Sequence, residues 1–525
     1  MQYGRRILYT DVPEITYQNV IDVLRKAFSE YRENINDINY LLMFDMGEQP
    51  LQRKTPKKVR PEIDETVIDN VAHEVVEFKL GFDWGNPITL VQRGEKDSGG
   101  SDEAKAIALL NECYEAEGNK SKTQKLARFI EICGIGYTYV ETRKKEDWED
   151  GDSYFSLSVL DPRCAFVVYS SYYIDQRSML GVTFRHDSKT GNNYFTCFSK
   201  DRRFEVLNLQ EIINGDTVKQ KEDWRHDKRS GEENPLHKIS IIEWIRSYDR
   251  TGAFEHQISE CNNLNLMLSD FTNDVEQSTQ AIWHTNDVEF PKEKIKLEDG
   301  TEKEVVAKPK SGQWLQTFTP ENGKTPIVEA LGTNYDYEGM LKNIHSARAR
   351  ILQKCDVPSR AENASNITGL ATDSATGWNA AENSANKKQS IIESCKMQEV
   401  DVALAAIRNS LAIEQDNPML KLRKIDIQPS IKRQKNYELT TKVNFFATAV
   451  SHGIHGLHAL RQMNAFEDVN QVWEDSKPLI EAYQKSVFEK GQNNGEGGNG
   501  EKEPDSERLE QDVSDQSINS PNLQG

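Results

Sequence analysis

The chain has 525 residues and a formal net charge of −19, because 84 acidic residues outnumber 65 Lys and Arg residues. This negative balance disfavours an ordinary DNA-coating protein, since Lys and Arg contacts to phosphate supply most non-specific affinity. The length predicts three or four substructures. No run approaches the roughly 18 apolar residues of a membrane span, and the first ten residues lack the apolar core of a secretory signal. We therefore expect a cytoplasmic product.

Residues 14–45 are predicted to form a helix, because apolar residues recur there at steps of three and four. A second helix within residues 68–88 is expected to stop at Gly81 and to lead into an extended segment. Residues 105–133 predict two further helices, and residues 134–141 predict a strand. The first part of the chain is thus expected to be mainly helical.

From residue 154 to residue 244 the apolar period changes to two, and turn residues such as Asp161-Pro162 and Asn214-Gly215 separate short runs. This pattern predicts an antiparallel β region. Because the helices precede the strands and do not alternate with them, the predicted fold class is α+β.

Two long helical patterns, residues 254–282 and 335–358, flank a turn-rich segment with short β-like runs at 283–334. The first helix carries an apolar stripe that extends beyond what one subunit would be expected to cover. We therefore predict contacts between this stripe and a neighbouring subunit. Its residues are Phe254, Ile258, Leu264, Leu268, Phe271 and Val275.

The last part of the chain begins with a polar Gly-, Ser- and Asn-rich stretch, which predicts a loop. A long helix at 377–411, a strand at 422–431 and a helical cluster at 437–488 are expected after it. From residue 491 onward hydrophobic residues nearly vanish, so we expect a disordered acidic tail.

Catalytic motifs are missing from the sequence: it contains no phosphate-binding loop, no dinucleotide fingerprint and no nucleophile elbow. The seven cysteines include no CxxC pair, which favours reduced thiols over a disulfide framework or a zinc ribbon. His452, His455 and His458 are the sharpest metal candidates, but Gly453 and Gly456 favour a corner between two helices. We expect no enzyme activity, no cofactor and no metal.

Seven segments between about residue 63 and residue 483 carry a resemblance to a known family. They are Asn70–Pro87 with its Gly85-Asn86-Pro87 turn, Leu160–Arg163, Asn234–Trp244, Phe254–Ala281, Tyr335–Pro358, Ser374–Ala380 and Gly453–Glu474. In these segments and in their order, the sequence resembles the portal proteins of tailed double-stranded DNA phages, of the siphophage type. Three of the segments depart from the family pattern. Lys238 and Ser240 stand where Gly and Pro are common, Thr376 replaces a Ser and Asn379-Ala380 an Ala-Leu pair, and His455-Gly456 stands in place of a Ser.

The resemblance implies a dodecameric ring, a homo-oligomer of twelve subunits, at one vertex of the virion capsid. DNA would pass through it without sequence specificity during packaging and ejection. Implied partners are the terminase large subunit, the major capsid and scaffolding proteins and a head-completion or adaptor protein, with assembly in the host cytoplasm. The implied parts are a wing (1–253), a stem helix (254–282), a clip (283–334), a second stem helix (335–358), a tunnel loop (359–376), a long tunnel helix with a strand returning to the wing (377–435), a crown (436–490) and the tail (491–525).

The same resemblance implies two groups of site residues. If the long helices line a channel, the tunnel loop would meet DNA; the alternative is a surface loop that faces solvent. The loop residues are Arg360, Asn363, Ser365, Asn366 and Thr368, and the clip residues expected to dock the packaging motor are Trp283, Lys292, Lys294 and Trp314.

Two other classes of protein remain open. A cytoplasmic coiled-coil scaffold would require heptads sustained without the β excursion at 283–334. A nucleic-acid enzyme would require a metal or phosphate motif, which is missing.

Overall fold

The computed structural model describes residues 4–50, 64–93, 102–213, 231–279, 282–286, 292–296, 302–306, 327–331, 336–358, 377–433, 439–463, 473 and 476–478. The chain divides into two units, residues 1–434 and 435–525, and each is described by itself. Helices and strands both contribute substantially, which confirms the predicted α+β class. The tail from residue 491 lies outside the described residues.

A seven-stranded sheet dominates the first part of the larger unit, with strand order β1-β5-β6-β7-β8-β10 and with β9 paired to β8. All of its pairings are antiparallel except β1 with β5, which is parallel. The antiparallel prediction for this region is confirmed, while strand β1 was not predicted. The strands are β1 (Leu8–Thr10), β5 (Ala165–Ser170), β6 (Ser178–Asp187), β7 (Asn192–Phe198), β8 (Arg202–Leu207), β9 (Glu211–Ile212) and β10 (Glu232–Glu233).

Helix α1 (Val20–Asp45) covers one face of this sheet. The Phe28 ring meets Phe184 and Phe195 at centroid distances of 5.2 and 5.1 Å, both edge to face. The helix begins six residues later than predicted. Asn19 explains the difference, because its side chain accepts from the Thr16 amide and donates to the Glu14 carbonyl, which holds a turn before the helix.

Strand β5 lies between two hydrophobic cores. Phe166 and Val168 face the α1 side, while Ala165 and Val167 belong to the second core. Alternate residues of a strand point to opposite faces, so a strand covered on both sides must be apolar almost throughout. This requirement accounts for the continuous run Ala-Phe-Val-Val in the sequence.

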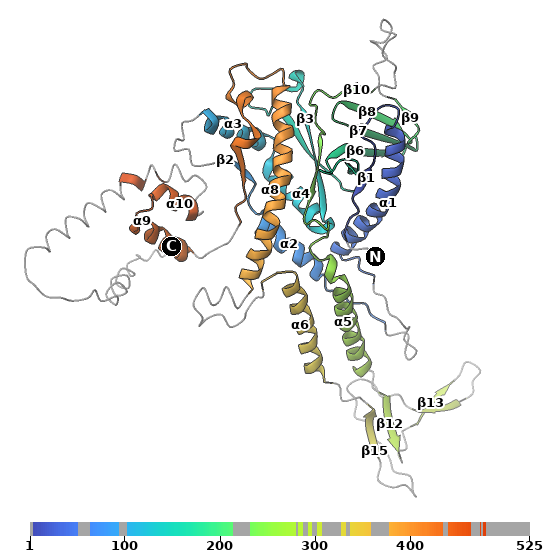
Figure 1. Cartoon of the computed structure of the whole chain (residues 1–525). Coiled ribbons are helices and arrows are strands. Elements are labelled where there is room, and N and C mark those ends of the chain that lie inside the picture. Colours follow the sequence, from blue (N-terminus) through green and yellow to red (C-terminus); the bar gives the residue numbers. More distant parts are fainter. Residues whose placement is uncertain are drawn as a thin grey trace, which may run out of the picture. The chain divides into compact units, whose positions relative to one another are not determined.

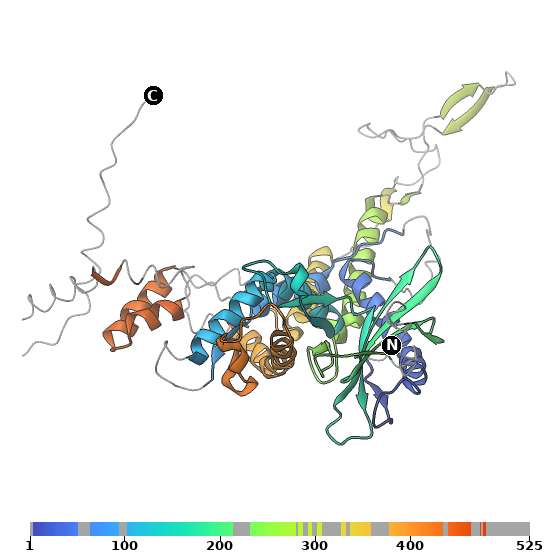
Figure 2. The same ribbon diagram turned by 90° about the horizontal axis from the view of Figure 1, so that it is seen from above.

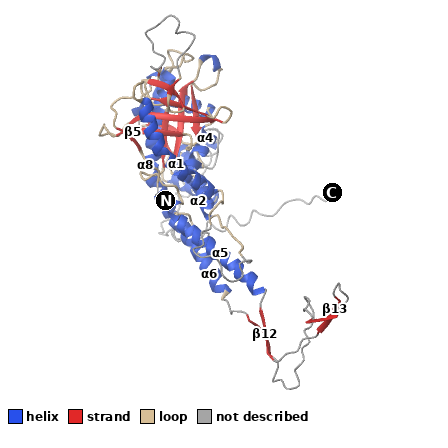
Figure 3. Cartoon of the chain, turned by 90° about the vertical axis from the view of Figure 1, so that its right-hand side faces the viewer, coloured by secondary structure: helices blue, strands red, loops and turns tan. Residues whose placement is uncertain are grey.

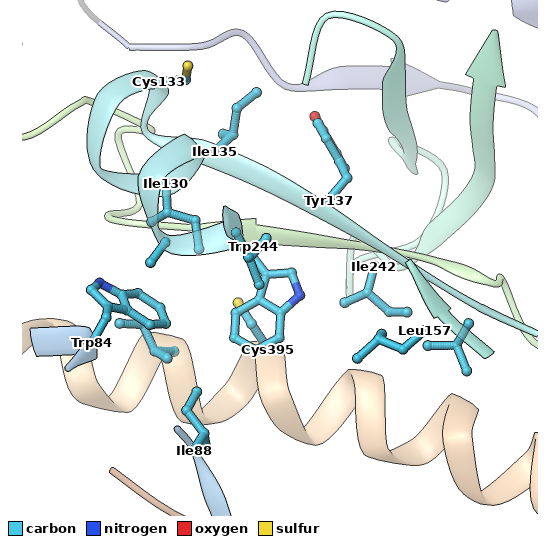
Figure 4. Close-up of a cluster of buried hydrophobic side chains, with 14 of the residues drawn as sticks. Trp84, Ile88, Ile130, Cys133, Ile135, Tyr137, Leu157, Ile242, Trp244 and Cys395 are labelled. Atoms are coloured by element: carbon cyan, nitrogen blue, oxygen red, sulfur yellow. The ribbon is translucent and has the colours of Figure 1, made fainter. Parts of the chain in front are cut away.

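The second core lies under a three-stranded sheet of order β11-β3-β4. In Figure 4, Trp84 and Trp244 converge on the same space as Cys395 of α8, so residues from distant parts of the chain fill one core. Figures 1 and 2 show α1 and α8 at opposite sides of the strands. The elements are α2 (Val71–Trp84), α3 (Asp102–Ala116), α4 (Asn119–Cys133), β3 (Ile135–Thr142), β4 (Phe155–Leu160), β11 (Ile241–Ile245) and α8 (Trp378–Arg408), with a short 3-10 turn at Lys145–Asp147.

Helices α5 (Ile258–Thr279) and α6 (Tyr337–Lys354) pack on each other and extend side by side away from the sheets (Figures 1 and 3). A 3-10 turn at Glu255–Gln257 leads into α5. Between the two helices, β12 (Ile282–Asn286) pairs with β15 (Ile327–Leu331), and β13 (Lys292–Lys296) pairs with β14 (Glu302–Val306). The predicted pair of helices with β structure between them is therefore present.

After α8 the chain returns to the first part of the sequence. Two 3-10 turns, Pro418–Lys421 and Lys424–Asp426, precede β16 (Ile427–Ser430), which pairs antiparallel with β2 (Thr89–Gln92). The predicted strand at 422–431 is thus shorter than expected, because its first half forms the second turn.

The smaller unit contains α9 (Leu439–Ser451) and α10 (Gly456–Met463), joined by a turn at Gly453, whose φ is +87°. His452 lies in that turn, His455 precedes α10 and His458 lies within α10. The rings of His455 and His458 are 5.7 Å apart at their centroids. The region is a helix–turn–helix corner, as the two glycines predicted. Among the described residues, no group of His, Cys, Asp and Glu is arranged to hold a metal ion.

Gly81 does not stop α2, and that prediction was wrong: the helix continues to Trp84. A Cβ atom at Gly81 would meet nothing within 4 Å, so the glycine is not required there. Replacing Gly81 by Ala is expected to stabilise the protein by about 0.5–1 kcal/mol, because glycine loses more backbone entropy in a helix. Chemical denaturation measures this.

Gly134 provides the matched control for that substitution. It ends α4 with φ +76°, and a Cβ there would lie 2.2 Å from the Arg250 carbonyl oxygen. Gly134→Ala should therefore destabilise by more than about 2 kcal/mol. A loss of stability in Gly81→Ala would show that glycine has a role in α2 that its open surroundings do not reveal.

Candidate functional site around the ends of α6 and α8

Most sequence-predicted site residues fall outside what the structure describes in side-chain detail. Arg360, Asn363, Ser365, Asn366, Thr368 and Trp314 lie outside the described residues. Three clip residues are placed by their backbone: Trp283 pairs with Ala330 across β12 and β15, and Lys292 and Lys294 lie on β13. The described residues on either side of segment 359–376, at the end of α6 and the start of α8, therefore define the candidate site.

The six stripe residues predicted to contact a neighbouring subunit separate into three groups by their burial. Phe254, Ile258 and Leu264 are buried in the core of the single chain, so they have no surface left for a neighbour and that prediction fails for them. Leu268 and Phe271 are half-buried against the same core, and Phe271 meets the Tyr337 ring of α6 at 6.0 Å. Val275 is 37% exposed.

A polar ladder holds the other side of α5. Asn265, Ser269 and Asn273 are buried side chains spaced four apart, so they share one face of the helix. Opposite them lies an extended segment in which residues 65, 67 and 69 face the helix.

The ladder consists of hydrogen bonds between these side chains and the backbone of the extended segment. Asn273 accepts from the Glu65 amide at 2.7 Å and donates to the Glu65 carbonyl at 3.1 Å. Ser269 Oγ accepts from the Val67 amide at 3.0 Å, and Asn265 accepts from the Asp69 amide at 3.0 Å. The spacing fits because two strand residues rise about 6.6 Å and four helical residues about 6 Å.

This ladder was not predicted, although the pattern Asn-x3-Ser-x3-Asn is present in the sequence of α5. Residues of this type in the interior of a long helix are poor helix formers, which is a reason to look for buried partners. Their partners lie about 200 positions away in the sequence, and nothing local identifies them.

Helix α2 joins the end of α6 to the start of α8. Val75 and Phe78 pack against Cys355 and Val357, which directly follow α6. On the other side, the Trp378 ring of α8 lies 5.9 Å from Phe78 and 5.6 Å from Phe82, centroid to centroid. One helix thus fixes both elements.

The two described neighbours of segment 359–376 are adjacent in space. A Cβ atom at Gly377, whose φ is +88°, would lie 3.7 Å from the Cα atom of Pro358. Just before Pro358, Asp356 adopts a positive φ of +54° and the Val357 amide donates to the Leu352 carbonyl, which ends α6 in a tight turn. The structure therefore places the two ends of the segment together on α2.

A buried cluster of charged groups surrounds this junction. Glu131 of α4, which is fully buried, accepts from Arg246 Nε at 2.8 Å, from Lys388 Nζ at 3.2 Å and from Trp84 Nε1 at 3.1 Å. Lys388 of α8 also forms an ion pair with Asp83 of α2. These contacts connect α2, α4 and α8 with one another and with Arg246, the residue that follows β11.

The cluster stabilises the charged form of Glu131 and destabilises the charged form of Lys79, as the direction of each pKa shift indicates. Burial alone would raise the pKa of Glu131, but the ammonium of Lys388 and the guanidinium of Arg246 outweigh it and hold that pKa well below its usual range. Burial, together with the like charge of Lys388, lowers the pKa of Lys79 from 10.5 to about 8. Lys79 Nζ donates to the Asp356 carbonyl oxygen at 3.3 Å, at the turn that ends α6.

Replacing Lys79 by Met is expected to stabilise the protein by on the order of 1–3 kcal/mol at pH 7, because a buried cation whose pKa falls on folding is a net cost. Below pH 8 the lysine is charged in both the folded and the unfolded state, so the cost is complete there. Between pH 8 and about 10.5 only the unfolded state binds the proton, so the parent gains stability as the pH rises.

The stability difference between Lys79→Met and the parent should therefore shrink as the pH rises from 7 to 9.5. Urea unfolding at several pH values measures it. The other ionisable groups near Lys79 are Asp83, Glu131, Lys388, Arg246 and the Cys355 thiol, which are present in both proteins. A difference that stays constant with pH would show that Lys79 pays no charge penalty on folding.

Helices α5 and α6 also differ in charge. Within its bounds α5 has four acidic residues and no basic one, whereas α6 has Glu338 as its single acid beside five basic or histidine residues. Some of these charges pair within the chain, since Lys354 contacts Glu260 and Arg348 contacts Asp69 and Glu74. The α6 residues are Lys342, His345, Arg348, Arg350 and Lys354.

Comparison with known proteins gives one clear result. A family model described as phage portal protein, SPP1 Gp6-like, matches residues 17–486. No curated protein matches the chain. Within the described part of the chain, no helix is both long and apolar enough to cross a membrane. Because the family model covers nearly the whole sequence, this protein belongs to the SPP1 Gp6-like family of phage portal proteins.

Proposed function

We propose that this portal protein assembles into a dodecameric ring at one capsid vertex, through which DNA enters during packaging and leaves during ejection. The observation that carries the proposal is the family match over residues 17–486, since portal proteins are structural components of the phage capsid. In this proposal the terminase large subunit, the capsid and scaffolding proteins and a head-completion protein bind the ring. Negative-stain images of the purified protein test it: rings with a central opening are expected.

The parts of the ring follow from the order of elements along the chain. We assign the wing to residues 1–253, the stem to α5 and α6 within 254–282 and 335–358, and the clip to 283–334. We further assign residues 359–376 to the tunnel loop, 377–435 to the tunnel helix and the returning strand, 436–490 to the crown and 491–525 to the tail. The pairing of β16 with β2 supports the assignment of 427–430 as the returning strand.

The charges of the stem support a closed ring. A head-to-tail ring requires each subunit to present two different surfaces, one to each neighbour. The acidic helix α5 and the basic helix α6 meet this requirement, because α5 of one subunit can face α6 of the next with opposite charge. The exposed apolar residues Val275 and Leu341, which are 37% and 40% exposed, would be covered in that arrangement.

The DNA-facing role of the tunnel loop depends on its polarity. Asn, Ser and Thr side chains exchange hydrogen bonds with phosphate without the lasting attraction of Lys or Arg, which suits a surface along which DNA slides. Changing Asn366 and Thr368 to Lys is expected to slow packaging severalfold at low salt, with a smaller effect at high salt. Single-molecule measurement of packaging rate at two ionic strengths tests this.

The control variant changes Asn366 and Thr368 to Gln, which adds length without charge and should package at the parental rate. Equal rates for the Lys variant and the parent at low salt, with rings intact, would show that the loop does not face DNA. At the clip, the proposal assigns terminase docking to Trp283, Lys292, Lys294 and Trp314, because aromatic and cationic side chains commonly anchor interfaces.

A further inference from the structure

Lys79 is the surplus cation of the buried cluster at the junction of α6 and α8. The cluster holds three cations, Lys79, Lys388 and Arg246, and two anions, Asp83 and Glu131. Arg246 and Lys388 already pair with the two carboxylates. Lys79 is instead bound to a backbone carbonyl at 3.3 Å, which is a weaker partner than a carboxylate.

Asp83 has one carboxylate oxygen that is available as a hydrogen-bond acceptor. Its Oδ2 atom binds Lys388, while Oδ1 is buried and has no hydrogen-bond partner among the described residues. Lys79 and Asp83 are four residues apart on α2, so their side chains lie on the same face within reach of one another. Lys79 therefore has two acceptors available, the Asp356 carbonyl and the Asp83 carboxylate.

We propose that Lys79 exchanges between these two acceptors and in doing so couples the end of α6 to the start of α8. When Lys79 donates to the Asp356 carbonyl, it stabilises the turn that ends α6, and Lys388 is the only one of the two lysines that pairs with Asp83. On Asp83 Oδ1, Lys79 releases that turn and competes with Lys388 for one carboxylate. A displacement of the end of α6 thereby weakens the attachment of α8 to α2, and the reverse holds equally.

Two observations favour exchange over a fixed structural role. The buried charge of Lys79 costs stability, as its lowered pKa indicates, so stability alone does not explain a lysine at this position. The buried Oδ1 atom of Asp83 has no hydrogen-bond partner among the described residues, so binding of Lys79 there would satisfy a buried acceptor. The significance of the coupling for DNA passage rests on the proposed function, but its existence does not.

Hydrogen–deuterium exchange on the 525-residue chain tests the coupling through the variant Lys388→Met. Among the described residues, Lys388 forms no hydrogen bond or ion pair with α6, so the substitution removes no direct contact there. It leaves two cations and two anions in the cluster. Lys79 should then move to Asp83, so the amides of residues 355–357 are expected to exchange about threefold to tenfold faster, as for the loss of one hydrogen bond. Lys388→Arg keeps the charge and should leave those amides unchanged.

Lys79→Met is the second variant. It should accelerate exchange at residues 355–357 while raising the overall unfolding temperature, a combination that a merely structural lysine would not give. Unchanged exchange at 355–357 in a folded Lys388→Met protein would overturn the proposal. Faster exchange there together with a lower unfolding temperature in Lys79→Met would also overturn it. Neither measurement requires a ring or DNA, so failure of the ring proposal would be seen separately.

Discussion

Replacing Glu131 by Gln is expected to destabilise the protein by about 3–5 kcal/mol, the range for breaking a buried ion pair by removing one partner. Glu131 is fully buried and faces both Lys388 and Arg246. Without its charge, three cations would share the single carboxylate of Asp83. Chemical denaturation at pH 7 measures the loss.

The acid dependence of stability follows from the same carboxylate. Because its folded pKa lies below the unfolded value, Glu131 contributes stability that is complete above the unfolded pKa, about 4.5, and is lost as the pH falls toward the folded value. The parent should lose this contribution progressively below about pH 4.5, and Glu131→Gln should lack it.

Glu77→Gln is the control, since Glu77 also pairs with an arginine, Arg128, but is about half exposed. Its loss should stay below about 1 kcal/mol, as for surface pairs. If both variants lose the same small amount, the buried cluster does not hold α8 to α2 and α4.

Changing Val275 and Leu341 together to Asp is expected to abolish ring formation while leaving folded subunits. Both residues are more than one third exposed within the single chain, so the substitutions should be tolerated by the fold. In a ring they would place carboxylates in an apolar contact, at a cost of several kcal/mol for each unpaired charge. Size-exclusion chromatography with circular dichroism measures both effects.

Ile174→Asp is the matched control for this pair. Ile174 is fully exposed in the turn between β5 and β6 of the seven-stranded sheet and does not belong to α5 or α6, so the variant should still form rings. Rings of normal size in the Val275 and Leu341 double variant would show that these exposed residues of α5 and α6 do not lie in the subunit interface.

Periodicity predicted the long helices and the β region, because a stripe of apolar residues determines both the element and its buried face. The stripe of α1 from Val20 to Ile38 and that of α8 from Ala381 to Ile407 are examples. Boundaries were less predictable: Asn19 delays α1 through its side-chain hydrogen bonds, and Gly81 fits in α2 because its surroundings are open.

The buried charged cluster of the candidate site could not be predicted from local sequence patterns, because its members are far apart in the sequence. Glu131 stands between two isoleucines near a helix end, which is an unusual place for a carboxylate, but its partner Lys388 is 257 positions away. Lys388 itself lies in a polar run that is typical of a solvated helix face. The partners of a buried charge are fixed by the packing of α2, α4 and α8, and one sequence does not reveal that packing.

The buried position of Phe254, Ile258 and Leu264 could not be predicted either, because an apolar stripe is the same whether it is covered by its own chain or by a neighbour. Among the described side chains of α5, Val275 near the C-terminal end is the large apolar residue that is more than one third exposed. The expected subunit contact, predicted along the whole stripe from Phe254 to Val275, is thus confined to the C-terminal end of α5.

The mass of the purified 525-residue chain tests the central claim most directly. Native mass spectrometry should give a closed ring of twelve copies of the 59.9 kDa chain. The mass should return to that of one subunit in the Val275 and Leu341 double variant. A parent protein that remains a monomer or a dimer at micromolar concentration, with the fold intact, would contradict assembly of this chain into a portal ring.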